Sequence, residues 1–299
     1  MTSGFIAVLA NPSAGRGRHR GLLPGVVDVL GHAGRPVRLL DAGSGAEAEA
    51  ACHRAVGAGA VAIVAVGGDG TVHRALQAVA GSEAGLGVVP AGTGNDFASA
   101  VGVPRQAMAA AEGISGAIRD QRDHRVDLAR TENAHGERRW FGAVLAAGFD
   151  ALINERANRM RWPTGPRRYD LAILLELAWA RARPYTIVLD GVRHHVDAEV
   201  VAVGNGPTYG GGMRIVPDAD PADGLLDVVF TSPLGRAGLA RLKPRLREGT
   251  HVDDPRVTVR RARTVRIEAE GIVGYADGER LGPLPLDVSV VPGAVRLLR

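Results

Sequence analysis

The sequence predicts an N-terminal α/β domain with a parallel sheet, followed by a C-terminal domain of antiparallel strands folded as a β-sandwich. Three observations predict this. Buried-strand and helix patterns alternate up to about residue 120, short strand-like runs follow one another after about Asp123, and the chain has 299 residues, about twice a common domain length. We expect domains at 1–123 and 124–292, with 293–299 returning to the first.

The expected strands of the first domain are continuous apolar runs, typical of strands buried on both faces, and the helices have one apolar face. In order, the elements are strand 5–10, a helical face at Leu22, Leu23, Val26, Val27 and Leu30, strand 37–40, an Ala-rich helix over 47–56, strand 61–66, a helical face at Val72, Ala75, Leu76 and Val79, and strand 86–89 before a further loop and helix.

The second domain is expected to be mainly β-structure because its strand candidates follow one another with few helices between them. Apolar and polar residues alternate over 257–259 and 265–267, as in half-exposed antiparallel strands. The strand candidates are 140–146, 185–189, 198–203, 225–230, 256–260, 264–269 and 286–291, and a helix is expected at about 168–182.

Composition excludes several classes of protein. Hydrophobic residues at 45% and charged residues at 23% exclude a disordered chain, and a net charge of +4 is too small for a dedicated nucleic-acid binder. Cys52 is the single cysteine, which excludes an intramolecular disulfide and zinc sites built on several thiolates. The most apolar later stretch, 171–180, is too short to span a bilayer and contains Glu176. We expect a cytoplasmic protein.

Loops rich in small residues follow three of the expected buried strands. They are Asn11-Pro12-Ser13-Ala14-Gly15-Arg16-Gly17, Gly67-Gly68-Asp69-Gly70-Thr71 and Gly92-Thr93-Gly94-Asn95-Asp96. Because the carboxyl ends of parallel strands share one edge of a sheet, the loops are expected to converge on one crevice. Glycine permits close backbone approach, and a helix N-terminus favours an anion. Each loop alone also fits an ordinary turn or helix cap, but the three together predict a site for a phosphate-rich ligand.

Asp69 places a carboxylate inside the second loop, where it would repel phosphate unless a cation lay between them. The loop therefore favours a nucleoside triphosphate with Mg²⁺ over phosphate alone. The sequence contains no G-x-x-x-x-G-K-[ST], and no G-x-G-x-x-G opens the first helix. Both absences argue against a P-loop enzyme and an ordinary NAD-binding oxidoreductase.

These residues resemble the diacylglycerol kinase catalytic domain family, which also includes sphingosine and ceramide kinases. The matching blocks occur in the family's order and cover nearly the whole chain. They are 11–15, 67–71, 90–97, 147–151, 205–206 with 210–212, 217–227 and 277–279. The resemblance implies a nucleotide-binding α/β domain followed by a β-sandwich, with the site in the cleft between them. It also implies transfer of phosphate from ATP to a lipid hydroxyl, most simply that of diacylglycerol or a related lipid.

The resemblance further implies which residues hold the nucleotide, with Asp69 near its magnesium. The residues assigned to ATP are Asn11, Pro12, Ser13, Ala14, Gly15, Gly67, Gly68, Asp69, Gly70, Thr71, Val72, His73, Gly92, Thr93, Asn95 and Asp96. Three positions depart from the family, since His73 and Arg74 stand where Asn-Glu is usual and Ser99 stands where an arginine is common.

By the same resemblance, Asp277 and Glu279 include the base that receives the proton of the lipid hydroxyl, without a decision between the two. The alternative is that Asp277-Gly278 is only a two-residue hairpin turn. The segment from Asp220 to Leu225 resembles a structural magnesium site of bacterial members. Its ligands would be the Asp223 carboxylate and backbone oxygens near Asp220 and Leu225, and the alternative is a polar turn before a strand.

Two basic regions are candidates for peripheral contact with the membrane that supplies the lipid. The first is Arg156, Arg159, Arg161, Arg167 and Arg168 around Met160 and Trp162, and the second is 236–247, with Leu239, Leu242 and Leu246 on one helical face. A solvated basic face is the alternative. No nucleic-acid partner is expected, and a homodimer is left open. Two other functions also stay open: an NAD kinase-like enzyme, because Gly-Gly-Asp-Gly marks that related group too, and a non-catalytic nucleotide- or lipid-binding module.

Overall fold

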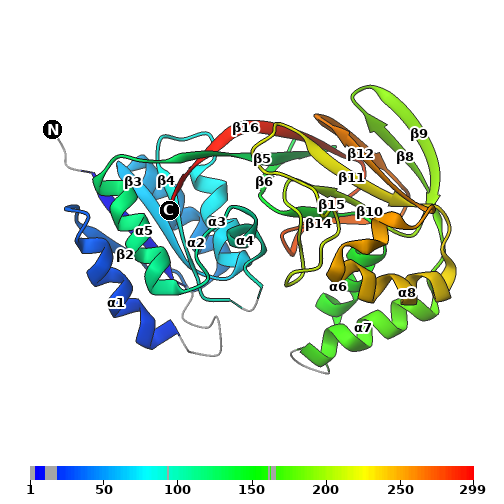
Figure 1. The fold of residues 1–299 in the computed structure, drawn as a ribbon, viewed down its shortest axis with the longest axis horizontal. Coiled ribbons are helices and arrows are strands. Elements are labelled where there is room, and N and C mark those ends of the chain that lie inside the picture. The colour runs from blue at the N-terminus through cyan, green and yellow to red at the C-terminus, as the bar shows by residue number, and fades with distance from the viewer. Residues whose placement is uncertain (1–3, 11–18, 93, 161, 163–165) are drawn as a thin grey trace. The chain divides into compact units, whose positions relative to one another are not determined.

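The computed structural model describes all residues except 1–3, 11–18, 93, 161 and 163–165, and the chain divides into two compact units (Figure 1). Unit 1 comprises 1–128, 221–223 and 291–299, and unit 2 comprises 129–220 and 224–290. The change of pattern at about Asp123, from alternating strands and helices to successive strands, lies close to the end of the first segment of unit 1, at Leu128.

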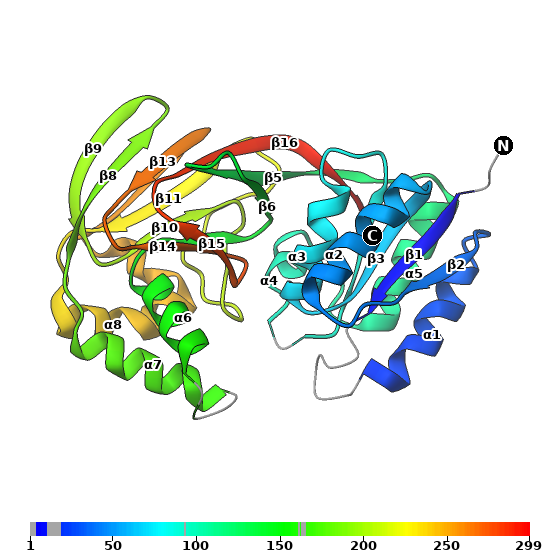
Figure 2. The ribbon, with the colours of Figure 1, turned by 180° about the vertical axis from the view of Figure 1, so that it is seen from behind.

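Unit 1 is a parallel sheet covered by helices on both faces (Figures 1 and 2). Its strands run in the order β2-β1-β3-β4, and the C-terminal end of β16 pairs in parallel with β4. The strands are β1 (Phe5–Ala10), β2 (Val37–Leu40), β3 (Ala60–Gly67), β4 (Gly85–Pro90) and β16 (Leu286–Leu298). The helices are α1 (His19–Gly31), α2 (Gly45–Gly57), α3 (Asp69–Val79), α4 (Asp96–Ala100) and α5 (Ala107–Arg119).

The apolar faces expected from the sequence form the core of unit 1. Val26 and Leu30 of α1 and Ile114 of α5 pack with Val64 of β3 and Val89 of β4, so α1 and α5 cover one face of the sheet. Helices α2 and α3 contact each other and β3 on the other face (Figure 2). The helices and strands expected for the first domain are confirmed to within a few residues at each end.

Unit 2 is a sandwich of two antiparallel sheets with helices outside it. The first sheet contains β16, β13, β8 and β9 in that order, and β5 pairs with β6. The second has the order β12-β11-β10-β7-β14-β15. The strands are β5 (His124–Asn133), β6 (Arg138–Phe141), β7 (Val144–Ala146), β8 (Arg183–Leu189), β9 (Val192–Ala198), β10 (Val201–Gly204), β11 (Leu226–Thr231), β12 (Val257–Ala262), β13 (Thr264–Glu268), β14 (Val273–Ala276) and β15 (Glu279–Pro283).

Side chains of both sheets form one core, in which Ile187 of β8 and Val265 of β13 cluster with Leu145 of β7 and Val228 of β11. The antiparallel sandwich is therefore confirmed. The helices α6 (Phe149–Arg159), α7 (Pro166–Ala178) and α8 (Gly235–Glu248) and the 3₁₀ helix η2 (Thr250–Asp253) complete the unit. Leu239 of α8 packs with residues of β7, β10 and β11, so α8 covers the outer face of the second sheet.

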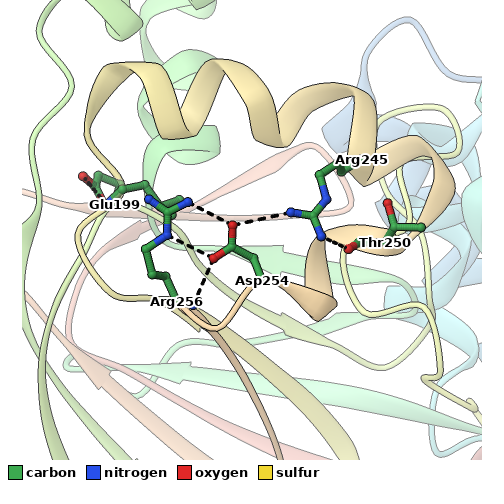
Figure 3. A network of polar contacts seen from close by, with 6 residues as sticks. Glu199, Arg245, Thr250, Asp254 and Arg256 are labelled. Carbon is green, nitrogen blue, oxygen red and sulfur yellow. Dashed lines mark hydrogen bonds and ion pairs between the residues drawn. The ribbon is translucent and has the colours of Figure 1, made fainter.

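Charged side chains fix α8 to the strands beside it (Figure 3). The buried Glu199 carboxylate accepts the amide protons of Leu234, at 3.0 Å, and Gly235, also at 3.0 Å, where the helix begins. Asp254 accepts from Arg256 Nη2 at 2.9 Å and from Arg245 Nη1 at 3.4 Å. The hydrogen bond from Arg256 is the main reason why the pKa of Asp254 is well below its usual range. The carboxylate therefore stays charged and links α8 to the segment that precedes β12.

The prediction of a single strand over 140–146 is wrong. Gly142 and Ala143 separate β6 from β7, and the two strands belong to different sheets. The amides of both residues donate to the Asp277 side chain instead of to a neighbouring strand. The apolar run concealed this break because buried strands in consecutive sheets have the same composition. Strands β5 and β9 and helix α6 were also not expected as elements.

Candidate active site

Two of the three glycine loops leave adjacent strands at the same edge of the parallel sheet. In the register of β3 with β4, Val66 pairs with Val89 and Gly67 with Pro90, so both strands end at one level. The pairing continues for one more residue, because the Ala91 amide donates to the Gly67 carbonyl at 2.9 Å. The expected convergence is therefore confirmed for the loops at 67–71 and 92–96.

Asp69 and Asn95 join the two loops. Asp69 Oδ2 accepts the backbone amide proton of Asn95 at 2.9 Å. Asn95 adopts the left-handed conformation, with φ of 65°, and its side chain bonds back to the amide and the carbonyl of Gly92, both at 3.1 Å. The left-handed region is most accessible to Gly and Asn, which explains why asparagine suits this position.

The approach of the two loops depends on glycine at both contact points. A Cβ atom on Gly92 would overlap the Cα atom of Gly68, and one on Gly68 would lie 3.1 Å from the Cα atom of Gly92. Backbone meets backbone here, so no flexible side chain can move aside. The glycines therefore bring the ends of β3 and β4 close enough for Asp69 to reach Asn95.

The residues predicted after Asp69 lie in the first turns of α3 with their side chains turned inward. Thr71, Val72 and His73 are all buried, and the His73 ring lies 3.4 Å from Gln77 Nε2 within the same helix. An anion at the start of α3 would therefore interact with the helix dipole and the backbone amides, and not with these three side chains.

The departure from the family at Arg74 has a structural explanation. Arg74 Nη1 lies 3.2 Å from Glu49 Oε2, so this side chain makes an ion pair with α2. The arginine thus joins the two helices on one face of the sheet, and the change from the usual acid is matched by a new partner. Ser99 is exposed on α4, and Asp96, at the start of that helix, is buried. Asn11, Pro12, Ser13, Ala14, Gly15 and Thr93 lie outside the described residues, and the assignment to ATP stays a prediction for these and for the described residues of the loops.

Asp277 forms the turn of the β14–β15 hairpin in unit 2, and its side chain is anchored to the backbone of the 142–143 segment. Asp277 and Gly278 have φ of 50° and 83°, so the hairpin turn predicted as the alternative is present. The carboxylate also accepts two backbone amide protons. Gly142 donates to Oδ2 and Ala143 donates to Oδ1, and both donor–acceptor distances are 3.0 Å. Both carboxylate oxygens are therefore hydrogen-bonded to the backbone of this segment.

Asn205 fixes the segment that holds Asp277. Its side-chain Nδ2 donates to the Gly142 carbonyl at 3.0 Å, and the amides of Asn205 and Gly206 donate to the Ala143 carbonyl at 2.8 and 3.0 Å. Asn205 is buried, with 1% of its surface exposed. The conspicuous Asn205-Gly206 pair is therefore part of the support of Asp277, a role that the sequence did not reveal.

Glu279, the second predicted carboxylate, is the first residue of β15 and lies opposite Ala276 of β14.

The block at 147–151 begins α6 beside β10. Gly148 has no room for a side chain, because a Cβ would lie 2.6 Å from the Glu199 carbonyl oxygen and 2.7 Å from the Val201 nitrogen. Burial raises the pKa of the Asp150 carboxyl, and a hydrogen bond with Tyr209 opposes that effect. This block thus places α6, and the charged residues that follow on it, against the second sheet.

The segment predicted to bind a structural magnesium forms a turn before β11. The Pro221 carbonyl accepts the Asp127 amide proton at 2.8 Å, and Asp220 and Asp223 are exposed. Carboxylate and carbonyl oxygens are the donors that Mg²⁺ prefers, so the chemistry of the turn fits the ion. Among the described residues, no three His, Cys, Asp or Glu side chains are grouped as a metal site. The assignment to Asp220, Asp223 and Leu225 stays a prediction based on one carboxylate and backbone oxygens.

Comparison with known proteins agrees with the arrangement of loops and sandwich. Residues 6–131 match the diacylglycerol kinase catalytic domain, and residues 143–299 match the YegS C-terminal NAD kinase beta sandwich-like domain. A solved diacylglycerol kinase structure from Bacillus anthracis str. Sterne has the same fold, with a TM-score of 0.72, 21% identity, and coverage of 100% of this chain and 97% of that chain.

Two curated relatives are similar along most of their length. A diacylglycerol kinase of Mycobacterium tuberculosis strain H37Rv is 42% identical over 297 residues, which cover 99% of this chain and 95% of the relative. A protein of Stenotrophomonas maltophilia strain K279a, named "Probable lipid kinase YegS-like", is 30% identical over 262 residues, or 84% and 82% of the two chains. The chain therefore belongs to the family of diacylglycerol kinases and YegS-like lipid kinases.

Proposed function

We propose that the protein transfers the terminal phosphate of ATP to the hydroxyl of diacylglycerol or a closely related lipid. The observation that carries the proposal is the junction of two glycine loops at the carboxyl edge of β3 and β4, which brings Asp69 to Asn95 in a chain of this family. The junction is compact and rich in backbone amides, and it begins a helix, which is the arrangement that phosphate groups require.

In this proposal the loops bind the triphosphate and Asp69 lies near its magnesium. Bound Mg²⁺ would neutralise charge on the phosphates, which is its usual contribution to phosphoryl transfer. The protein's own part is to hold the phosphates by backbone groups at 67–71 and 92–96. Oδ2 of Asp69 is used in the contact with Asn95, which orients the carboxylate within the loop.

Asp277 and Glu279 supply the base in the same proposal. Transfer to an alcohol needs an acceptor for the hydroxyl proton, and a fixed carboxylate suits that role. Asp277 is the more firmly held of the two, because both its oxygens accept backbone amide protons. We therefore assign the proton acceptor to Asp277 and a contact with the acceptor lipid or the metal to Glu279.

The test is to incubate the protein with labelled ATP and Mg²⁺ in the presence of diacylglycerol, a sphingoid base or NAD. Label in an organic-soluble product formed from diacylglycerol supports the proposal. Label in a product of the sphingoid base would show that this lipid, and not diacylglycerol, is the acceptor. Label in NADP would assign the chain to the NAD kinase-like alternative. No transfer to any acceptor would contradict the proposal. Asp277→Asn serves as the inactive control for contaminating kinases.

We also propose that the exposed apolar residues around α7 contact the membrane that contains the lipid. Trp162 before the helix and Trp179 after it are 80% and 76% exposed, and Leu174 between them is 65% exposed. Arg167, in the first turn of α7, and Arg181, shortly after the end of the helix, are exposed. Apolar side chains flanked by cations match the interface of an anionic bilayer. None of the helices in the described ranges has the length and apolar character needed to cross a membrane.

Helix α8 supports this contact only through its basic side. Leu239, Leu242 and Leu246, which the sequence placed on one helical face, are buried against the second sheet. The exposed side of α8 has the residues Arg236, Arg241, Lys243 and Arg247. In the first basic region, Arg156 pairs with Glu176 and Arg159 with Glu155, and Arg161 lies outside the described residues. Contact with lipid is thus expected to depend on the tryptophans of the α7 region.

Co-sedimentation with phosphatidylglycerol vesicles tests the membrane contact, with phosphatidylcholine vesicles for comparison. Trp162→Ala/Trp179→Ala should reduce binding to the anionic vesicles several-fold while turnover of a short-chain, dispersed diacylglycerol is retained. Leu39→Ala is the matched control, because Leu39 is an exposed apolar residue of unit 1, at 57%. Equal binding by the parent and the double variant would refute a role for these residues.

A further inference from the structure

The hairpin that carries Asp277 and Glu279 is attached to α6 as well as to the 142–143 segment. Tyr275 Oη donates to Glu155 Oε2 at 2.6 Å, and Arg280 Nε lies 3.1 Å from the same oxygen. Tyr275 and Arg280 are directly opposite each other in the register of β14 with β15. One carboxylate oxygen of α6 therefore binds both strands of the hairpin at a single level.

Two further hydrogen bonds surround this contact. Its other oxygen, Oε1, accepts from Arg159 Nη2 at 2.6 Å, and Asn158 Nδ2 donates to the Tyr275 hydroxyl at 3.3 Å. The Tyr275 ring is buried against Ala146 and Ala151, and the Glu155 side chain is only 16% exposed. The hydrogen bond from Tyr275 is the main reason why the pKa of Glu155 is lowered. The carboxylate is charged at neutral pH and has two cationic partners.

The contact lies close to the proposed catalytic carboxylates. The next pair of the hairpin after Tyr275 and Arg280 is Ala276 with Glu279, and the turn at Asp277 follows. Asp277 is fixed on the other side by the amides of Gly142 and Ala143. Strand β14 is held by its pairing with β7 at Tyr275 and Ala276. Strand β15 is the outer strand of this sheet, and the contact of Arg280 with Glu155 attaches it to α6 one pair from the turn.

We propose that Glu155 is a positioning residue for phosphoryl transfer, which holds the β14–β15 hairpin so that Asp277 and Glu279 meet the acceptor hydroxyl in one geometry. The proposal rests on the proposed function, because it takes this pair to act on the hydroxyl. Displacement of a reacting group by about 1 Å can lower a rate about a hundredfold, so a support of this kind affects turnover. It should not affect the affinity for ATP, whose predicted loops belong to unit 1.

Three single variants test the proposal. Glu155→Gln keeps the shape of the side chain and removes its charge, and Arg280→Gln and Arg159→Gln each remove one cationic partner of Glu155. Both arginines are well exposed, at 50% and 76%, but only Arg280 belongs to the hairpin, so Arg159→Gln is the matched control. We expect kcat to fall about 10- to 100-fold in Glu155→Gln and about fivefold in Arg280→Gln, with less than a twofold change in Arg159→Gln. KM for ATP should stay within about twofold in all three.

Hydrogen–deuterium exchange of the peptide covering 273–283 provides a readout independent of turnover. Exchange there should be faster in Glu155→Gln and Arg280→Gln than in the parent and in Arg159→Gln. Unchanged exchange and kcat in the first two variants would overturn the proposal, as would equal losses in all three. Should Glu155→Gln not fold, the two arginine variants give the same comparison. A parent without transfer to any lipid would contradict the proposed function, and exchange would still decide whether Glu155 fixes the hairpin.

Discussion

Asn205 and Asp277 are connected through the backbone of one residue, Gly142. The Asn205 side chain donates to the Gly142 carbonyl at 3.0 Å, and the Gly142 amide donates to Asp277 Oδ2 at 3.0 Å. The break between β6 and β7 is what frees both backbone groups for this connection. An asparagine on one strand end thereby determines where the carboxylate of a distant hairpin is held.

Removal of the Asn205 side chain should impair turnover through Asp277. Asn205→Ala leaves the buried Gly142 carbonyl without this donor, at a cost of about 1–3 kcal/mol in the free energy of unfolding. We expect kcat to fall at least tenfold and the affinity for ATP to be unchanged. Kinetics with diacylglycerol, together with thermal melts, measure both effects. The control is Asn133→Ala, at the β5–β6 turn of the same unit. Equal kcat for parent and Asn205→Ala would contradict the connection.

Substitution of the two carboxylates should separate their contributions. Loss of a general base typically lowers turnover about 10²–10⁴-fold, which we expect for Asp277→Asn. This variant also presents an NH₂ group to one of the two amide donors, Gly142 or Ala143, so a lower melting temperature should accompany the loss. Glu279→Gln should have the melting temperature of the parent and a lower turnover, and its affinity for ATP should be unchanged. Equilibrium binding of ATP and steady-state kinetics test both variants. Parental turnover in either variant would remove that residue from the proposed pair.

The charge of Asp69 should be needed for the magnesium dependence of nucleotide binding. Asp69→Asn keeps an oxygen that can accept the Asn95 amide proton, so the junction of the loops should be preserved. Calorimetric titration of ATP with and without Mg²⁺ should show a strong effect of the ion in the parent and a weak one in the variant. Asp120→Asn, an exposed position of the same unit, is the control. An unchanged metal response would separate Asp69 from the ion.

A methyl group at Gly92 should force the two loops apart. Gly92→Ala places its Cβ against the Cα of Gly68, and overpacking of this kind costs about 1–3 kcal/mol in the free energy of unfolding. ATP binding should be lost or strongly weakened. In Gly57→Ala the new Cβ meets no atom within 4 Å near the end of α2, so that variant should be neutral or slightly stabilised. Chemical denaturation and ATP titration compare the two variants, and normal ATP binding by Gly92→Ala would contradict the close approach.

The thiol of Cys52 should react only when the protein unfolds. Cys52 is fully buried in α2, and burial raises its pKa to about 12, with a smaller effect from Glu49. Because the thiolate is the reactive form, N-ethylmaleimide at pH 8 should not label the folded protein, whereas denatured protein should be labelled at once. Mass spectrometry of the labelled chain measures the extent. Rapid labelling of folded protein would show that α2 opens readily.

Local patterns in the sequence were sufficient to predict the parallel sheet, its helices and the loops after β3 and β4. Strands buried on both faces are continuous apolar runs, and the glycines at Gly68 and Gly92 mark where two backbones approach, so these features are visible without a structure. The hairpin at Asp277-Gly278 could also be predicted, because Asp-Gly is a typical two-residue hairpin turn. The break at Gly142 could not be predicted, since two short buried strands and one longer strand have the same composition.

The contacts that give the candidate residues their positions were decided by the tertiary structure alone. Asp277 meets Gly142 and Ala143, Glu155 meets Tyr275, and Arg74 meets Glu49, and each pair joins elements that are separated along the chain. Periodicity records which face of an element is apolar, but it contains no information on which polar side chain will lie opposite another after folding. Only packing of the sheets and helices brings these donors and acceptors within hydrogen-bond distance.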